Sequence, residues 1–292
     1  MYFVGIDAGG TKTDFLLCDE KENQIKKVTL GAGNPNDIGI DACISLLSKG
    51  LDELCDGCVP DAVFAGVSGG GYGENAERIK SFLQSRFPNS RVDNGTDAIN
   101  LLYCSASSGN VGALICGTGT ALFLRVDGKL VRFGGWGHLF DNGGSAYDIG
   151  RDALRFMLEC EENFSSALSS PLYTLLREQL GSSAHDALNS IYANGKSYIA
   201  SFAPLVFNAY EKGDTAAVSI INSNVDSVAD RIFLAISMYG SVDEIVCAGG
   251  LFNSSLFYDL SAKKVDIPLS LLEISPVSGA CRCAMRGREK FL

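Results

Sequence analysis

Asn94-Gly95-Thr96-Asp97-Ala98 and Gly117-Thr118-Gly119-Thr120 are the stretches that decide how this chain is interpreted. Two apolar runs, residues 2–6 and 111–115, each lead into a loop of Gly and Thr residues. Backbone N–H groups in such loops can hold phosphate oxygens. We expect the two loops to face each other across one cleft, with Asp97 between them. An acid in that position indicates a general base that deprotonates a hydroxyl group as it attacks the terminal phosphate of a nucleotide.

The strand pattern around these loops occurs twice along the chain. Apolar strands are expected over residues 2–6, 13–18 and 24–30, and the same order of strands and turns returns over residues 111–133. A buried strand that runs into consecutive glycines also occurs twice, over residues 61–70 and 243–250. The sequence therefore predicts an α/β fold with a duplicated βββαβα core and a nucleotide site between the two copies.

Helical patterns fill most of the remaining chain. The first helix begins at Asn36 or Asp37, whose side chains can cap it, and Asn36 can alternatively bind a polyol. The longest helical region, about residues 145–240, belongs to the second copy only and ends in a long helix from about residue 214. The other helices are expected to end near residues 54, 87 and 105, and a closing helix begins at residue 276.

The chain length of 292 residues predicts two domains. We expect an N-terminal lobe of residues 1–106, joined by the closing helix of about residues 276–292, and a C-terminal lobe of residues 107–275. The net charge of −10 argues against nucleic acid or an anionic membrane as a partner, because both are bound mainly through Lys and Arg. No apolar run approaches the ~20 residues that span a bilayer, and the first residues lack a signal-peptide pattern. We therefore expect a cytoplasmic protein.

The ten cysteines have two interpretations. Without a secretory signal, ten reduced thiols are the simpler one. Alternatively, two close pairs of cysteines could together form a four-thiolate zinc or iron–sulfur site. These pairs are Cys55 with Cys58 and Cys281 with Cys283.

Two aspartates are the candidates for chemistry. Asp97 begins a helical pattern, so capping and catalysis are both open to it. A carboxylate at the strand-to-helix junction of an α/β sheet points into the crevice where ligands bind, which favours catalysis. Asp7, at the end of the first strand, is placed to hold a hydrated Mg²⁺.

The Gly/Thr loops and one later segment are the candidate nucleotide site. Glycines allow close approach of the backbone, and threonine hydroxyl groups add donors. Gly249 and Gly250, after the last strand of the repeat, leave room for an adenine or a ribose. The predicted phosphate ligands are Gly9, Gly10, Thr11, Lys12, Thr13, Gly117, Thr118, Gly119 and Thr120.

A further Gly-rich segment reads Gly134-Gly135-Trp136-Gly137-His138 and is followed by Gly144-Ser145-Ala146-Tyr147. From the residues alone, a packing tryptophan and a structural histidine are the favoured roles of Trp136 and His138. Together with the Gly/Thr loops, however, these motifs resemble the N-acetylglucosamine kinase family. That family belongs to the sugar kinase, actin and Hsp70 ATPase superfamily and is related to the BadF/BadG-type ATPases.

The resemblance covers most of the chain and implies a fold, an activity and a set of ligands. The implied fold has two ribonuclease H-like lobes, as in actin-like ATPases, with a cleft that closes when sugar binds. The implied reaction transfers the γ-phosphate of ATP to the 6-hydroxyl of N-acetylglucosamine or a related amino sugar, with Mg²⁺ as cofactor and Asp97 as base. The implied sugar ligands are Asn36, Asp97, Thr118, Trp136 and Gly137.

The chain departs from the family pattern at Asp141-Asn142-Gly143-Gly144, where the family usually reads Gly-Asp-Glu-Gly. The acid expected to bind sugar hydroxyls falls at Asn142, and Asp141 lies one place earlier. An amide can still donate and accept hydrogen bonds, so Asn142 stays a predicted sugar ligand. The change widens the substrate choice, and N-acetylmuramic acid becomes an alternative sugar.

Two other functions stay open. One is an ATPase that activates a 2-hydroxyacyl-CoA dehydratase or a related reductase, although Gly-Thr-Gly-Thr at residues 117–120 and the segment around Trp136 favour the sugar kinases. The other is a non-catalytic sensor of nucleotide or sugar, which the acid at Asp97 argues against because a sensor needs no base. A homodimer is an open alternative for the assembly.

Overall fold

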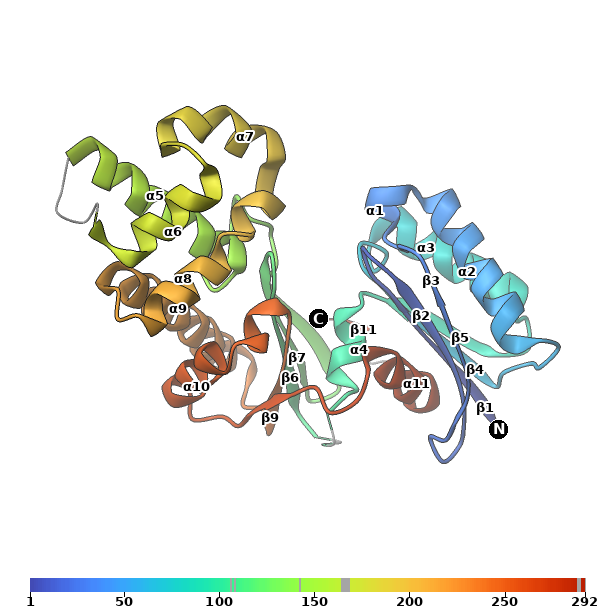
Figure 1. The fold of residues 1–292 in the computed structure, drawn as a ribbon. Helices are drawn as coiled ribbons and strands as arrows, with labels where there is room; N and C mark the ends of the chain where they lie inside the picture. Colours follow the sequence, from blue (N-terminus) through green and yellow to red (C-terminus); the bar gives the residue numbers. More distant parts are fainter. Residues whose placement is uncertain (106, 108, 142, 164–168, 288–289, 292) are drawn as a thin grey trace. The chain divides into compact units, whose positions relative to one another are not determined.

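The computed structural model describes residues 1–105, 107, 109–141, 143–163, 169–287 and 290–291 (Figure 1). The chain forms two compact units. The first unit contains residues 1–113, 123–131 and 272–292, and the second contains residues 114–122 and 132–271. The lobe boundaries expected from the sequence stay a prediction.

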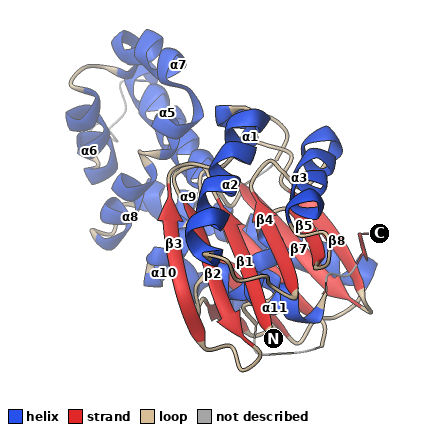
Figure 2. Cartoon of the chain, turned by 90° about the vertical axis from the view of Figure 1, so that its right-hand side faces the viewer, coloured by secondary structure: helices blue, strands red, loops and turns tan. Residues whose placement is uncertain are grey.

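The first unit contains a five-stranded sheet in the order β3-β2-β1-β4-β5. The strands β1, β2 and β3 are antiparallel neighbours, whereas β4 runs parallel to β1 and β5 runs parallel to β4. Figure 2 shows these strands side by side, with helices in front of them. The strands are β1 (Tyr2–Ala8), β2 (Thr13–Asp19), β3 (Gln24–Leu30), β4 (Ala62–Val67) and β5 (Arg91–Gly95).

Helices cover both faces of this sheet. On one face, alternate residues of β1 such as Val4 and Ile6 are buried in one core with Leu47 and Leu51 of α2 and Ile79 of α3. On the other face α11 packs against β1, where a side chain at Gly5 would collide with the α11 backbone. The helices are α1 (Pro35–Ile38), α2 (Ile40–Cys55), α3 (Gly73–Arg86), α4 (Ala98–Leu102) and α11 (Pro276–Arg286).

The second sheet repeats this plan. Its order is β10-β9-β6-β7-β8-β11, so that β8-β7-β6-β9-β10 corresponds to β3-β2-β1-β4-β5 of the first sheet. The predicted duplication of the βββαβα core is therefore confirmed. Two short strands were not predicted, because β10 and β11 are too short to show an apolar pattern. The strands are β6 (Val111–Cys116), β7 (Thr120–Val126), β8 (Lys129–Gly134), β9 (Glu244–Ala248), β10 (Leu269–Leu271) and β11 (Lys290–Phe291).

The region between β8 and β9 is helical, as predicted. Its last helix, α9, is capped by Asp214, whose side chain accepts a hydrogen bond from the N–H group of Ala217. None of the helices in the described part of the chain has both the length and the apolar character needed to cross a bilayer. The helices are α5 (Ala146–Asn163), α6 (Pro171–Leu180), α7 (Ala184–Ala200), α8 (Ala203–Glu211) and α9 (Thr215–Tyr239), with η2 (Gly250–Asn253) and α10 (Ser255–Lys264) following β9.

Three local expectations were wrong. The first helix is capped by Asn34 rather than Asn36 or Asp37, and Pro35 occupies its first turn. Gly39, with a φ of 83°, then divides the expected single helix into α1 and α2. The helix after Asp97 ends at Leu102 instead of near residue 105.

All ten cysteines are free thiols, and all except Cys58 are buried. Burial raises the pKa of Cys43 and Cys55 to about 11, as expected for thiols among apolar neighbours. No group of three potential metal ligands among His, Cys, Asp and Glu is found in the described residues. The alternative of a four-thiolate site at Cys55, Cys58, Cys281 and Cys283 is thus not supported.

Candidate active site

The carboxyl ends of three parallel strands place the candidate catalytic residues in the first unit. Asp7 of β1 is in register with Gly66 of β4, which is in register with Gly95 of β5. Asp7 and the residues that follow β5, including Asp97, therefore reach the same edge of the sheet. This edge is where ligands bind in open α/β sheets.

Asp97 caps α4, and its carboxylate is held by several donors. Oδ1 accepts hydrogen bonds from the hydroxyl of Thr96 at 2.9 Å and from the N–H group of Ala98 at 3.1 Å. Ser68, which follows β4, lies near this carboxylate and partly offsets the effect of burial on its pKa. Burial nevertheless raises the pKa of Asp97 above its usual value. The capping interpretation is confirmed. The capping carboxylate also lies at the edge of the sheet where ligands bind in open α/β sheets.

Asp7 has one carboxylate oxygen fixed by a buried amide. Nδ2 of Asn100, a residue of α4 with 0% of its surface exposed, donates to Oδ1 of Asp7 at 2.6 Å. Burial raises the pKa of Asp7 to about 6, because the charged form loses its hydration. A hard cation would relieve that cost, and a carboxylate oxygen is the ligand type that Mg²⁺ prefers. The residues present thus fit a magnesium ion at Asp7.

The first Gly/Thr loop, residues 9–13, joins β1 to β2 as a tight turn. The N–H group of Gly9 donates to the carbonyl of Lys12 at 2.9 Å. Nζ of Lys12 donates to the buried carboxylate of Asp14 at 2.7 Å, and Thr29 donates to the other oxygen at 2.6 Å. Thr13 is fully buried, and its hydroxyl donates to the carbonyl of Gly31. Gly10, Thr11 and Lys12 are the exposed members of this loop.

Asn36 lies beside the loop that follows β4. Nδ2 of Asn75 donates both to Oδ1 of Asn36 at 3.4 Å and to the carbonyl of Gly69 at 3.3 Å. Gly71 of the same loop lies against Thr96, because a Cβ on Gly71 would be 2.4 Å from the backbone nitrogen of Thr96, the neighbour of Asp97. The structure therefore brings the predicted sugar ligand Asn36 into the same loop cluster as the predicted base.

In the second unit, the second Gly/Thr loop, residues 117–120, is a tight turn between β6 and β7. The N–H group of Gly117 donates to the carbonyl of Gly119 at 2.9 Å, and Thr118 and Gly119 are exposed. Gly249, with a φ of 100°, lies so close that a Cβ there would be 2.5 Å from the carbonyl oxygen of Cys116. The structure thus brings the predicted phosphate loop and the predicted adenosine segment together, and Gly250 is exposed next to them.

The Trp136 loop, residues 134–141, follows β8. Asp141 holds it closed, since its two carboxylate oxygens accept hydrogen bonds from the N–H groups of Gly135 at 3.1 Å and Gly137 at 2.8 Å. The guanidinium of Arg132 bonds to the carbonyls of Gly134 and Gly135 and lies 4.7 Å from the ring centre of Trp136. Trp136 stays 66% exposed. Asn142, a predicted sugar ligand, lies outside the described residues.

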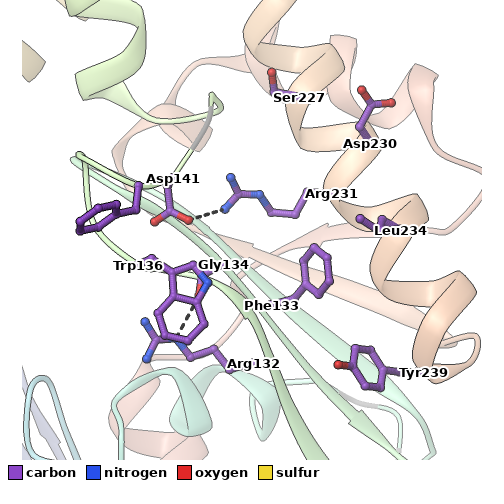
Figure 3. Close-up of a pocket in the computed structure, with 11 residues that line it drawn as sticks. Arg132, Phe133, Gly134, Trp136, Asp141, Ser227, Asp230, Arg231, Leu234 and Tyr239 are labelled. Atoms are coloured by element: carbon purple, nitrogen blue, oxygen red, sulfur yellow. Dashed lines mark hydrogen bonds and ion pairs between the residues drawn. The ribbon is translucent and has the colours of Figure 1, made fainter.

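A cavity of about 510 Å³ lies between the Trp136 loop, β8 and α9 (Figure 3). An aromatic surface with charged groups around it is a common arrangement for a polar ring-shaped ligand. Figure 3 shows Arg231 directed from α9 toward Asp141 across this cavity. The charged and aromatic residues that line it include Arg132, Trp136, Asp141, Asp230, Arg231 and Tyr239.

Sequence reasoning missed four residues that contact the candidate segments, two in each unit. In the first unit, Asn100 donates to Asp7, and Ser68 lies near Asp97. Asn224 and Arg231, both on α9, bond to the segment around residues 141–144. A signal was present for Arg231, since it is a charged residue within the apolar pattern of residues 225–235.

The strand order and the two units define the class of protein, namely α/β proteins with a duplicated βββαβα core. The chain has the fold of a crystal structure from Chromobacterium violaceum that is provisionally assigned as an N-acetylglucosamine kinase, with a TM-score of 0.70 and 20% identity over 96% of this chain and 97% of that one. This likeness confirms the predicted actin-like α/β fold. The particular family follows from the sequence: the chain belongs to the BadF/BadG/BcrA/BcrD ATPase family, which it matches over residues 4–280.

Two curated relatives lie within the class that the sequence predicts. The chain is 26% identical to the N-acetyl-D-glucosamine kinase of Dictyostelium discoideum, over 90% of this chain and 89% of the relative. It is 27% identical to the N-acetylmuramic acid/N-acetylglucosamine kinase of Clostridium acetobutylicum, over 88% of each. The resemblance inferred from the motifs is thereby confirmed.

Proposed function

We propose that the protein is an ATP-dependent kinase that phosphorylates the 6-hydroxyl of N-acetylglucosamine or a closely related amino sugar. The observation that carries the proposal is the carboxylate of Asp97, which is half-buried and accepts hydrogen bonds from Thr96 and Ala98 at the carboxyl edge of the sheet. The family and the names of the curated relatives support the same activity.

In the proposed reaction, Asp97 accepts the proton of the sugar hydroxyl while the oxygen of that hydroxyl attacks the γ-phosphorus. The bond between the γ-phosphorus and the β–γ bridging oxygen breaks, and ADP leaves. A raised pKa suits this role, because a stronger base takes the proton more readily. The donors from Thr96 and Ala98 keep the carboxylate in one orientation.

The backbone of residues 117–120 and of residues 9–12 supplies N–H donors for the phosphates in this proposal. Asp7, held in place by Asn100, is the residue that would carry Mg²⁺. Mg²⁺ neutralises charge on the phosphate oxygens when it is bound. Gly249 and Gly250 admit the adenosine, since neither has a side chain that would block it.

For the sugar, the proposal assigns Asn36, Asp97, Thr118, Trp136, Gly137 and Asn142. The exposed ring of Trp136 offers an apolar surface to a sugar face, and its other side is supported by Arg132. The two relatives differ in that one name includes N-acetylmuramic acid. Both sugars therefore belong in the test.

The test is ADP release by the purified protein with Mg²⁺-ATP and one sugar at a time. The panel contains N-acetylglucosamine, N-acetylmuramic acid, N-acetylmannosamine and glucose. The variants Asp97→Ala and, as a matched control, Asp259→Asn are measured beside the wild type. Asp259 is exposed on α10 and is not assigned to any substrate. The proposal requires release that one amino sugar stimulates, that Asp97→Ala loses and that Asp259→Asn keeps.

The other function within reach of the family is an ATPase that activates a reductase or dehydratase. That function predicts ATP hydrolysis that no sugar stimulates, together with iron–sulfur absorption after purification without air. Such a result would replace the kinase proposal.

A further inference from the structure

Arg231 joins two loops of the second unit that the proposed function assigns to different substrates. Its side chain is only 8% exposed. Nη1 donates to the carbonyl of Thr120 at 3.2 Å, in the second Gly/Thr loop, and lies 3.7 Å from Oδ1 of Asp141 in the Trp136 loop. Nη2 reaches the carbonyl of Gly143 at 3.5 Å. One guanidinium thus contacts the predicted phosphate loop and the predicted sugar loop at once.

We propose that Arg231 couples nucleotide binding at residues 117–120 to the conformation of the Trp136 loop, and so makes the two substrates bind cooperatively. This inference rests on the proposed function, because it takes these loops as the nucleotide and sugar sites. Arg231 is assigned here as a positioning residue, which acts through Thr120 and Asp141.

The contacts of Asp141 give this coupling a direct route to Trp136. The oxygen of Asp141 that faces Arg231, Oδ1, also accepts the hydrogen bond from Gly135, and Oδ2 accepts the one from Gly137. These two N–H groups lie on either side of Trp136. A displacement of the guanidinium therefore changes the backbone that carries the indole ring.

The residues around Arg231 leave space and acceptors that suit an arginine at this position. Gly134 has a φ of 77°, and a Cβ there would lie 2.5 Å from Nη1 of Arg231, so that a larger residue would push the guanidinium away. Two turns earlier on the same helix, Oδ1 of Asn224 accepts from the N–H group of Gly144 at 2.9 Å. Helix α9 thus provides a fixed base, and the planar fork of arginine can serve several acceptors on different loops, which a lysine ammonium does less well.

The chain contains a built-in probe for the test, because Trp136 is its only tryptophan. We expect the Mg²⁺ complex of a non-hydrolysable ATP analogue, added without sugar, to change the emission of Trp136 in the wild-type protein. We also expect the analogue to tighten N-acetylglucosamine binding by at least ~5-fold, the lower end of ordinary coupling between sites. Calorimetry measures both affinities on the full chain.

In Arg231→Met, the analogue should still bind, but the emission change should vanish and the tightening of sugar binding should fall to about 1-fold. Arg231→Lys should keep part of both effects. Arg155→Met, which alters an exposed arginine of α5, is the matched control and should behave as wild type. Asp141→Asn keeps one acceptor oxygen but loses the other together with the charge opposite Arg231, so it should reduce the coupling as well.

A merely structural role makes a different prediction, namely reduced thermal stability with the emission change and the coupling intact. That outcome in Arg231→Met, or in Arg231→Lys and Asp141→Asn if the first variant does not fold, overturns the inference alone. Failure of the wild-type protein to bind nucleotide at all overturns the proposed function and the inference with it.

Discussion

The two copies of the βββαβα plan share a strand order but differ in charge at corresponding positions. In the first copy, the turn between β1 and β2 is flanked by Asp7 and Asp14 and contains Lys12. In the second copy, the turn between β6 and β7 runs from Cys116 to Thr120 with no charged residue. The difference suggests a division of work, in which the first copy supplies carboxylates for chemistry and the second supplies neutral backbone donors for binding.

The copies also differ in what connects their third and fourth strands. In the first, α1 and α2 lie between Leu30 and Ala62, whereas in the second, the described residues between Gly134 and Glu244 form the helices α5 to α9. The longer connection supplies Arg231 and Asn224, which hold the loops of its own unit. An insertion in one copy has therefore become part of the support for the candidate site.

The largest expected effect tests whether chemistry depends on the first copy. Asp97→Ala should lower kcat by at least ~100-fold, the usual contribution of a general base, while nucleotide affinity stays close to wild type. Steady-state kinetics of ADP release and calorimetry with an ATP analogue measure the two quantities. If the variant keeps wild-type turnover, the first copy does not supply the base.

A smaller effect is expected when the close approach of Gly249 to Cys116, in the second copy, is disturbed. Gly249→Ala places a methyl group 2.5 Å from the carbonyl oxygen of Cys116 and forces a φ of 100° on a residue with a side chain. Strain of this kind costs ~1–3 kcal/mol, so we expect the KM for ATP to rise by about 10-fold or more with a smaller change in the KM for sugar. Gly31→Ala is the matched control, because no atom lies within 4 Å of a Cβ there and the residue is not assigned to the nucleotide or the sugar. Equal effects of the two substitutions would contradict the assignment of Gly249.

A third variant asks whether the metal position depends on support from α4. Asn100→Ala removes the amide that holds Oδ1 of Asp7 at 2.6 Å. By analogy with other residues that support metal ligands, we expect the Mg²⁺ concentration for half-maximal activity to rise by about 10-fold, at unchanged sugar affinity. Asn163→Ala, at an exposed end of α5, serves as the control. An unaltered Mg²⁺ requirement would show that Asn100 has no such role.

The sequence was most informative where local pattern decides the structure. The strands other than β10 and β11, the duplication and the two Gly/Thr turns follow from apolar runs and glycines, and these were predicted. The cap at Asn34 could also have been predicted, since a proline directly after an Asn is typical of a helix start. Ser68 and Asn100 could not be assigned, because their neighbours lie on other strands and loops and no periodic pattern encodes such contacts. Arg231 stands out as a charge within an apolar pattern, but the sequence does not show which loops it contacts.

The last variant measures how much the charge of Asp7 lowers the free energy of unfolding. Burial raises the pKa of Asp7 to about 6, above its unfolded value of 3.8, so the unfolded chain binds fewer protons between these values. The free energy of unfolding therefore falls as pH rises through this window, and the full decrease is reached above it.

The variant Asp7→Asn keeps an oxygen for Asn100 but has no charge to bury. In urea unfolding with EDTA, we expect it to exceed wild type by about 1–2 kcal/mol at pH 7.5 and to match it near pH 3.5, a discounted fraction of the full shift. Asp259→Asn, at an exposed site, should give a difference that does not vary with pH. A gain for Asp7→Asn that is the same at both pH values would mean that it arises from packing rather than from the buried charge.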